Sequence, residues 1–360
     1  MSGQPDADSG PRLTAGPGSG PSGVPAAIAL SPILSARYRS RDLDRIRAAA
    51  PGSRIVTLSV EGRSDESVDD VEVLLQGWLS SEAYDRLLAR APRLAWVHSA
   101  SAGVERALTP TARERGIVIT NARGVFSRPI AEYVLMMILA VSRRLPGLLE
   151  LQRERTWQPL EGTELRDVTV GIVGLGSIGR AVGALATSFG CRVVATRRRP
   201  AASATASAAT DDEPAFGEAM LDRVGGPETL PALLAESDFV VLAAPLTPET
   251  ENLIDAATLA LMKPGAWLIN VARGRLVDER ALLRALRDGP LGGAILDTFR
   301  DEPLQASSPF YDLPNVIVTP HTSWSSGRVL DRSVELFADN LERFAKGEPL
   351  LNVVDPRQGY

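Results

Sequence analysis

The chain has 360 residues, of which 44% are hydrophobic and 23% charged, and its formal net charge is −5. This length predicts two or three domains, and the apolar fraction is sufficient for buried cores. The acidic balance argues against nucleic-acid partners, and without a run of about 18 apolar residues we expect no membrane span. The single cysteine, Cys191, cannot form an internal disulfide, so we expect a cytoplasmic protein in which this thiol is packed.

The first part of the chain predicts a tail followed by a small α/β unit. Residues 1–24 are rich in Gly, Pro, Ser and Ala and are expected to be disordered, without the pattern of a signal peptide. Strands are expected at 26–30, 55–60, 71–75 and 94–98, and helices at 41–50 and 82–90. A long apolar helix follows at 130–143, which suits a dimer interface or the core. This alternation predicts a parallel sheet.

A second series of strands runs from about residue 145 to 320. Its six strand-like segments are 168–173, 192–196, 239–243, 266–271, 293–297 and 315–319. Residues 201–228 interrupt the series with a low-complexity stretch, which we interpret as a mobile surface insert. A last helix is expected at about 328–345, after which residues 352–354 can return to the first domain.

A glycine-rich turn joins the first strand of this second series to a helix. Gly174, Gly176 and Gly179 form the pattern G-x-G-x-x-G, with Ser177 and Ile178 between the last two glycines. Apolar residues after the turn recur at helical spacing, so the order is strand, turn, amphipathic helix. This context is the one that a dinucleotide fingerprint needs, because the helix start presents free N–H groups to phosphates. A structural turn between strand and helix is the alternative.

The ends of all six strands carry residues suited to ligand binding. In chain order these are Gly174, the arginines at 197–199, Ala244 with Pro245, Ala272 with Arg273, Asp297, and His321. Because ligands of open parallel sheets bind outside the carboxyl ends of the strands, we predict the active cleft at this edge.

Three ionisable residues at this edge suggest the chemistry. Arg273 can grip a carboxylate through its planar guanidinium, or it can be a surface ion-pair residue. His321 can give a proton near neutral pH, and a carboxylate from Glu302 within reach would raise its pKa. The alternatives are a packed histidine and a solvated loop acid. The other histidine, His98, lies on a predicted strand, and we expect it to be structural.

Four segments resemble the D-2-hydroxyacid dehydrogenase family, and the arginines at the second strand end resemble those of its glyoxylate and hydroxypyruvate reductases. Residues 270–278 resemble N-x-x-R-G-x-x-V-D, residues 297–303 resemble D-V-F-x-x-E-P, residues 319–321 read T-P-H, and residues 245–250 read P-L-T-P-E-T. The similarity extends over roughly residues 90–355. It implies two α/β domains, a discontinuous flavodoxin-like substrate domain and a Rossmann dinucleotide-binding domain. The expected boundaries are 25–144 and 325–360 for the former and 145–324 for the latter.

The resemblance also implies roles for individual residues. Arg273 would orient the substrate, His321 would be the acid or base, and Glu302 would tune it. Asp297 would hold the nicotinamide carboxamide, and the backbone of Ala244, Pro245, Val271 and Ala272 would line the cofactor. Backbone amides of Ala100, Ser101, Ala102 and Gly103 would receive the substrate carboxylate. No metal site is expected, and the domains would close on the ligands.

The residues after the second strand depart from the NAD pattern. NAD-specific folds place an acid about 20 residues past the glycines, where this chain has Arg197, followed by Arg198 and Arg199. Arginines attract a 2′-phosphate, so NADP(H) is predicted in preference to NAD(H). A solvated basic run is the alternative. A second departure is Trp324, which can wall the substrate pocket or pack between the domains.

Together these features predict an NAD(P)-dependent oxidoreductase that reduces a small 2-oxo acid, glyoxylate or hydroxypyruvate first, and works as a homodimer. A non-catalytic interaction protein that senses a dinucleotide on the same fold is the rival interpretation. A third interpretation is an enzyme of the same kind that acts on formate or phosphite, but we find no motif specific to either substrate.

Overall fold

The computed structural model describes residues 23–32, 38–198 and 220–357. Most of the predicted tail and residues 201–219 of the predicted insert therefore lie outside the described residues, as does Arg199. The described chain forms two compact units. Unit 1 contains the residues up to Ala100, Val104–Asn121 and Val334–Pro356, and unit 2 contains Ser101–Gly103, Ala122–Ser333 and Arg357.

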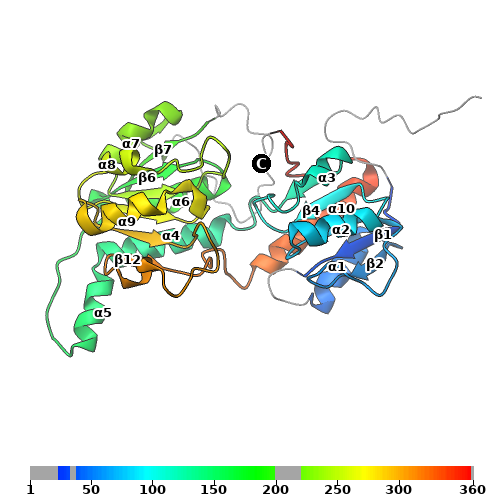
Figure 1. Cartoon of the computed structure of the whole chain (residues 1–360), viewed down its shortest axis with the longest axis horizontal. Helices are drawn as coiled ribbons and strands as arrows, with labels where there is room; N and C mark the ends of the chain where they lie inside the picture. The colour runs from blue at the N-terminus through cyan, green and yellow to red at the C-terminus, as the bar shows by residue number, and fades with distance from the viewer. Residues whose placement is uncertain (1–22, 33–37, 199–219, 358–360) are drawn as a thin grey trace, which may run out of the picture. The chain divides into compact units, whose positions relative to one another are not determined.

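Unit 1 is built on a five-stranded parallel sheet in the order β2-β1-β3-β4-β5 (Figure 1). The strands are β1 (Ala27–Leu30), β2 (Arg54–Thr57), β3 (Val71–Gln76), β4 (Trp96–Ser99) and β5 (Val118–Asn121), and the helices are α1 (Ser40–Ala49), α2 (Ser81–Arg90) and α3 (Pro110–Glu114). This order, 2-1-3-4-5, is the flavodoxin-like one, so the predicted fold of this domain is confirmed.

The C-terminal part of the chain completes unit 1. Most of α10 (Val329–Lys346) belongs to this unit, and Phe337 and Phe344 on this helix pack against the ring of Trp96. Beyond the helix, the N–H of Val354 donates to the carbonyl of Ile119 at 2.8 Å. Unit 1 is thus assembled from segments more than 200 residues apart in the sequence.

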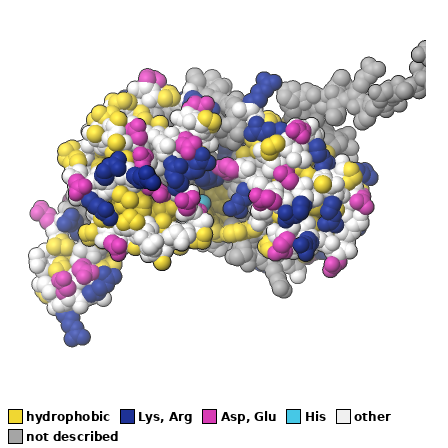
Figure 2. Space-filling model, in the orientation of Figure 1, with side chains coloured by type: hydrophobic (Ala, Val, Ile, Leu, Met, Phe, Trp, Pro, Cys, Tyr) yellow, Lys and Arg dark blue, Asp and Glu magenta, His cyan; other side chains and the backbone are white. Residues whose placement is uncertain are grey.

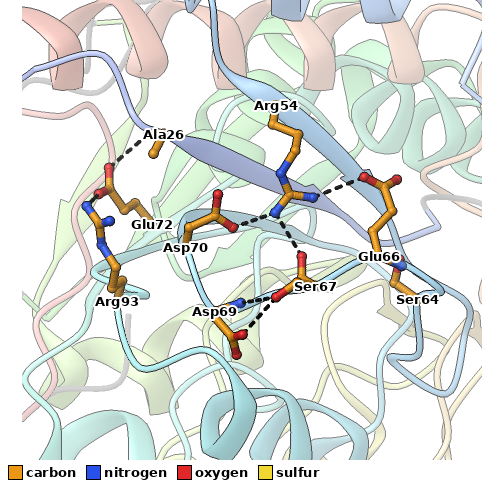
Figure 3. A network of polar contacts seen from close by, with 9 residues as sticks. All are labelled: Ala26, Arg54, Ser64, Glu66, Ser67, Asp69, Asp70, Glu72 and Arg93. Atoms are coloured by element: carbon orange, nitrogen blue, oxygen red, sulfur yellow. Dashed lines mark hydrogen bonds and ion pairs between the residues drawn. The ribbon is translucent and has the colours of Figure 1, made fainter.

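A network of charged side chains joins the amino ends of three strands of unit 1 (Figure 3). Arg54, the first residue of β2, contacts Asp70 and donates to Glu66 at 3.0 Å. Glu72 accepts from the N–H of Ala26 at 3.1 Å and pairs with Arg93. These groups lie at the edge opposite the carboxyl ends of the strands, so they hold the sheet together away from the predicted ligand edge.

His98 on β4 is fully buried, as the sequence predicted for a structural histidine. Its Nδ1 atom lies 2.8 Å from Oγ1 of Thr120, which also accepts from Nε1 of Trp96 at 2.9 Å. Burial lowers the pKa of His98 well below its ordinary value, so the ring is neutral in the core.

Unit 2 contains a seven-stranded parallel sheet in the order β12-β11-β10-β9-β6-β7-β8. The strands are β6 (Thr169–Val173), β7 (Arg192–Thr196), β8 (Arg223–Gly225), β9 (Phe239–Leu242), β10 (Trp267–Asn270), β11 (Gly293–Leu296) and β12 (Val316–Val318). The helices of this unit include α4 (Ser127–Ser142), α5 (Leu145–Arg153), α6 (Ser177–Ser188), α7 (Leu230–Glu236), α8 (Ala256–Ala260) and α9 (Glu279–Asp288). Counted from β6, the order is 3-2-1-4-5-6-7, which confirms the Rossmann fold.

Two details of unit 2 differ from the sequence interpretation. The predicted insert 201–228 contains β8, which pairs with β7 and makes seven strands rather than six. This three-residue edge strand carries one apolar side chain, Val224, so it has no hydrophobic pattern to reveal it. The units also divide at residues 121 and 333 instead of near 144 and 324. The reason for the first difference is that α4 packs against α6 of the Rossmann unit.

The surface of each unit mixes both signs of charge (Figure 2). Arg45 of α1, for example, pairs with Glu335, Asp339 and Glu342, which lie along one side of α10. No helix within the described ranges has the length and hydrophobicity needed to cross a membrane.

Candidate active site

The strand order of unit 2 reverses between β6 and β9, which are neighbours in the sheet. Chain segments leaving their carboxyl ends run in opposite directions, and this divergence opens a crevice at the edge of the sheet. The glycine turn leaves β6 at this point, and Ala243, Ala244 and Pro245 leave β9. The predicted residues of both segments therefore lie at the switch point.

The three glycines of the turn differ in what a side chain at each position would meet. Gly174 has a φ of 102°, and a Cβ there would lie 2.6 Å from the backbone nitrogen of Ala244. A Cβ on Gly179 would lie 2.2 Å from the carbonyl oxygen of Gly174, so this glycine lets the helix pack on the turn. A Cβ on Gly176, in contrast, would meet no described atom within 4 Å. The chain packs against the first and third glycines and leaves open space at the second.

This open space lies at the start of α6, whose first residue is Ser177. Gly176 is the N-cap residue, and among the described residues no side chain caps this helix. The first intrahelical bond is donated by Arg180 to Gly176, so the N–H groups of Ser177, Ile178 and Gly179 precede the helical ladder. Uncapped N–H groups beside an open glycine fit the pyrophosphate of a dinucleotide.

Arg273 lies on the loop that follows β10 and is held close to the loop that follows β11. Its Nη1 atom donates to the carbonyl of Ala272 at 2.8 Å, and the N–H of Ala272 donates to Oδ1 of Asn270 at 3.1 Å. A Cβ on Gly274 would lie 1.9 Å from the carbonyl carbon of Phe299. The residue after Arg273 must therefore be glycine, because the backbone of Phe299 after β11 occupies the place where a Cβ would lie.

Glu302 and His321 form a direct pair. The Nδ1 atom of His321 lies 2.8 Å from Oε2 of Glu302, and Oε1 accepts from the N–H of Phe299 at 3.0 Å. Burial alone would raise the pKa of the Glu302 carboxyl, but the hydrogen bonds and the charges of His321 and Arg273 hold it below its ordinary value. The His321 side chain is 40% exposed, and its Nε2 atom has no hydrogen-bond partner in the described chain. One ring nitrogen is fixed and the other faces outward.

Asp297 is fully buried and uses its carboxylate to hold the loop that carries His321. Its Oδ1 accepts from Oγ1 of Thr319 at 2.6 Å and from the N–H of Thr322 at 2.8 Å, and Oδ2 accepts from the N–H of Ser323 at 2.9 Å. Sequence reasoning assigned Asp297 only to the cofactor and missed Thr319. The threonine of the T-P-H segment is the sequence feature that could have revealed this contact.

Trp324 completes this loop. Its Nε1 atom donates to the carbonyl of His321 at 2.7 Å. Trp324, which departs from the family pattern, therefore contacts the backbone of the predicted acid–base residue directly.

The predicted cofactor-selecting arginines follow β7. The N–H of Arg197 donates to the carbonyl of Gly225 on the neighbouring strand at 2.9 Å. The Nη1 atom of Arg198 lies 3.8 Å from Oε2 of Glu249, which follows β9. Both side chains of this ion pair are exposed, at 45% and 70%. Arg198 is thus brought to the side of the P-L-T-P-E-T segment, a neighbour that the sequence did not reveal.

The predicted substrate loop begins where β4 ends. The N–H of Ala100 donates to the carbonyl of Gln76 at 2.7 Å, which extends the ladder of unit 1. This bond corrects the prediction for Ala100, because its amide is engaged by the sheet. Ser101, Ala102 and Gly103 group with unit 2, where the carbonyl of Ser101 accepts from the N–H of Ala122 at 3.0 Å. The predicted contact with the substrate carboxylate is therefore limited to Ser101, Ala102 and Gly103.

Comparison with known proteins identifies the relatives of this chain. Residues 135–323 match the model of the D-isomer specific 2-hydroxyacid dehydrogenase NAD-binding domain. A glyoxylate reductase from Thermococcus gammatolerans is 35% identical over 292 residues, which is 79% of this chain and 82% of the relative.

Solved structures agree with this match. A D-isomer specific 2-hydroxyacid dehydrogenase from Xanthobacter autotrophicus, in complex with NADPH, aligns with a TM-score of 0.78 and 32% identity over 93% of this chain and 99% of that one. An NADPH-dependent glyoxylate/hydroxypyruvate reductase from Sinorhizobium meliloti, in complex with NADP, aligns with a TM-score of 0.75 and 27% identity. The alignment covers 93% of this chain and 100% of that one.

Proposed function

Because the chain belongs to the D-isomer specific 2-hydroxyacid dehydrogenase family of NAD(P)-dependent oxidoreductases, we propose that it reduces a small 2-oxo acid to the 2-hydroxy acid with His321 as the proton donor. Glyoxylate and hydroxypyruvate are the first substrates that we propose. The observation that carries the proposal is the 2.8 Å contact between Nδ1 of His321 and Oε2 of Glu302, which leaves Nε2 facing outward.

The cofactor would be held by the glycine turn and the neighbouring strand ends. Gly174, Gly176 and Gly179 with the first N–H groups of α6 would receive the pyrophosphate, and the backbone of Ala244, Pro245, Val271 and Ala272 would line the rest. Because Asp297 is fully buried in this structure, its predicted contact with the nicotinamide amide would require the loop of Thr322 and Ser323 to expose Oδ2. When bound, the reduced cofactor supplies the hydride.

The protein side chains would bind the substrate and move the proton. Arg273 would bind the carboxylate of the 2-oxo acid bidentately and orient its carbonyl. His321 would hold a proton on Nε2 and deliver it to the carbonyl oxygen, while Glu302 stabilises the imidazolium through Nδ1. In the reverse direction the same nitrogen would take the hydroxyl proton. Amides of residues 101–103 would add a second contact to the carboxylate.

We propose that NADP(H) is preferred over NAD(H). Arg197 and Arg198 occupy the positions after β7 where an acid would favour the ribose 2′-hydroxyl. Since the Arg198–Glu249 ion pair is long and exposed, it is weak, and a 2′-phosphate can replace Glu249 as the partner. Relatives whose structures contain NADPH or NADP support this choice.

Steady-state kinetics with a panel of 2-oxo acids and both cofactors tests the proposal. We expect oxidation of NADPH with glyoxylate or hydroxypyruvate, and loss of this activity in His321→Ala with cofactor binding retained. Cofactor binding without turnover of any 2-oxo acid would favour the non-catalytic sensing protein instead. Turnover restricted to formate or phosphite would change the substrate class.

We also propose that the protein is a homodimer and that α5 lies in its interface. Helix α5 contains no buried residue, and Figure 1 shows it projecting from the rest of unit 2. Its Leu145, Leu148 and Leu149 side chains are 45%, 39% and 43% exposed, and Trp157 beyond it is fully exposed. A second copy offers the same apolar surface, so two such arms can cover each other.

Sedimentation equilibrium tests the dimer. We expect wild type to be dimeric and the double variant Leu148→Glu/Leu149→Glu to be monomeric. Gln152→Glu is the control, because it adds a charge to the same helix without removing an apolar side chain. A monomeric wild type, or a dimer that survives the double substitution, would contradict this assignment.

A further inference from the structure

Three side chains of unit 2 form a hydrogen-bonded chain that ends at the loop of His321. The hydroxyl of Tyr133, on α4, lies 2.7 Å from Oγ1 of Thr319, and this threonine donates to Oδ1 of Asp297 at 2.6 Å. A threonine hydroxyl has one proton, which the carboxylate takes, so Tyr133 must be the donor in the first contact. The chain therefore runs in one direction, from Tyr133 through Thr319 to Asp297.

The loop at the end of this chain has a backbone conformation that needs support. His321 has a φ of 49°, in the left-handed region that is unfavourable for a residue with a side chain. Such residues persist where the surroundings fix them. Here Asp297 accepts from the N–H groups of Thr322 and Ser323, and Trp324 donates to the carbonyl of His321. The bonds to Asp297 thus hold the two residues that follow His321.

We propose that Tyr133 is a positioning residue which, through Thr319 and Asp297, fixes the loop of residues 319–323 and thereby the direction of the His321 ring. This inference rests on the proposed role of His321. Tyr133 suits the task because it lies on a 16-residue helix that packs against α6, and its side chain is only 9% exposed. The loop is thereby anchored to a rigid element 186 residues away in the sequence.

The tyrosine also stays a donor over the working pH range. Burial, together with the nearby charge of Asp297, raises the pKa of Tyr133 to about 12 even though Thr319 accepts its hydrogen bond. The order of the chain therefore does not reverse near neutral pH.

The test compares variants that remove a hydroxyl with variants that keep it. Tyr133→Phe and Thr319→Val delete one hydroxyl each with little change in shape, Thr319→Ser retains the hydroxyl, and Tyr311→Phe deletes an exposed hydroxyl elsewhere in unit 2. Hydrogen exchange of the Thr322 and Ser323 amides is measured first, since it reports on the loop without requiring activity. Steady-state constants for the 2-oxo acid and the cofactor follow.

We expect faster exchange at both amides in Tyr133→Phe and Thr319→Val, and wild-type exchange in Thr319→Ser and Tyr311→Phe. In the same two variants kcat should fall about tenfold with an unchanged KM for the cofactor, because the glycine turn is untouched. The effects of Tyr133→Phe and Thr319→Val should not add, since both break one chain.

Two results would overturn the inference. One is wild-type exchange at Thr322 and Ser323 in Tyr133→Phe. The other is a lower melting temperature of this variant with unchanged kcat, which would give Tyr133 a structural role only. A protein in which exchange responds as expected but His321→Ala remains fully active would refute the proposed function and leave the anchoring of the loop intact.

Discussion

Nδ1 of His321 and Oε2 of Glu302 are 2.8 Å apart, and the other oxygen of the same carboxylate accepts from the backbone of Phe299. Glu302 is therefore fixed by the main chain at the same time as it fixes the imidazole. An acid–base pair assembled in this way needs no movement of the carboxylate during proton transfer. The residue pair joins the loops after β11 and β12, which explains why their two sequence motifs occur together.

Replacement of Glu302 by glutamine tests this pair. Glutamine retains an oxygen for the N–H of Phe299 but loses the charge that stabilises the imidazolium, so we expect kcat to fall about tenfold or more. The KM for the cofactor should not change. Because the pKa of Glu302 lies below its ordinary value of 4.5, the carboxylate persists above that pH and its contribution is lost as the pH falls further. Asp301→Asn, which removes the adjacent carboxylate, is the control, and an equal loss in both variants would speak against a specific role for Glu302.

Much of this site could be predicted from the sequence, because its residues follow buried strands. The apolar runs located the strands, and the residues after them came together since all strands of the sheet are parallel. Contacts that depend on tertiary packing were not predictable. Tyr133 resembles any aromatic residue of an apolar helix, and periodicity does not tell which sheet α4 covers. Likewise, Glu249 is a loop acid in the sequence and becomes relevant only because β9 ends beside β6.

The second and third glycines of the turn provide a matched pair of substitutions. Gly176→Ala places a methyl group in open space at a φ of −84°, so stability should be unchanged while KM for the cofactor rises about tenfold or more. Gly179→Ala places the methyl group 2.2 Å from the carbonyl oxygen of Gly174 and should lower stability by about 2 kcal/mol. Urea unfolding and cofactor kinetics distinguish the two effects. The assignment of Gly176 to the phosphates would fail if its alanine variant bound the cofactor normally.

Charge substitutions after β7 and β9 test the cofactor preference. Arg198→Ala should raise the KM for NADPH about tenfold and change that for NADH much less, because only the former has a 2′-phosphate. Glu249→Gln should act in the opposite direction, since it removes a competitor for Arg198. Arg192→Ala is the control: this residue lies at the amino end of the same strand and pairs with Glu236 at 2.8 Å. A parallel change for both cofactors in Arg198→Ala would exclude recognition of the phosphate.

The buried histidine of unit 1 predicts how stability depends on pH. Burial lowers the pKa of His98 from 6.5 to about 3, so the folded chain keeps this ring neutral while the unfolded chain protonates it below pH 6.5. The unfolded state thus binds more protons, and stability should fall as the pH drops from 6.5 towards 3.

Substitution of His98 by asparagine separates this titration from that of all other groups, which the two proteins share. The asparagine amide offers the Thr120 hydroxyl both a donor and an acceptor but does not titrate. The free energy of unfolding of wild type should decline relative to His98→Asn by about 1.4 kcal/mol between pH 8 and pH 5.5. Urea midpoints over this range measure the difference. If both proteins lost stability in parallel, His98 would be protonated in the folded state, and its place in the core beside Trp96 and Phe337 would have to tolerate a charge.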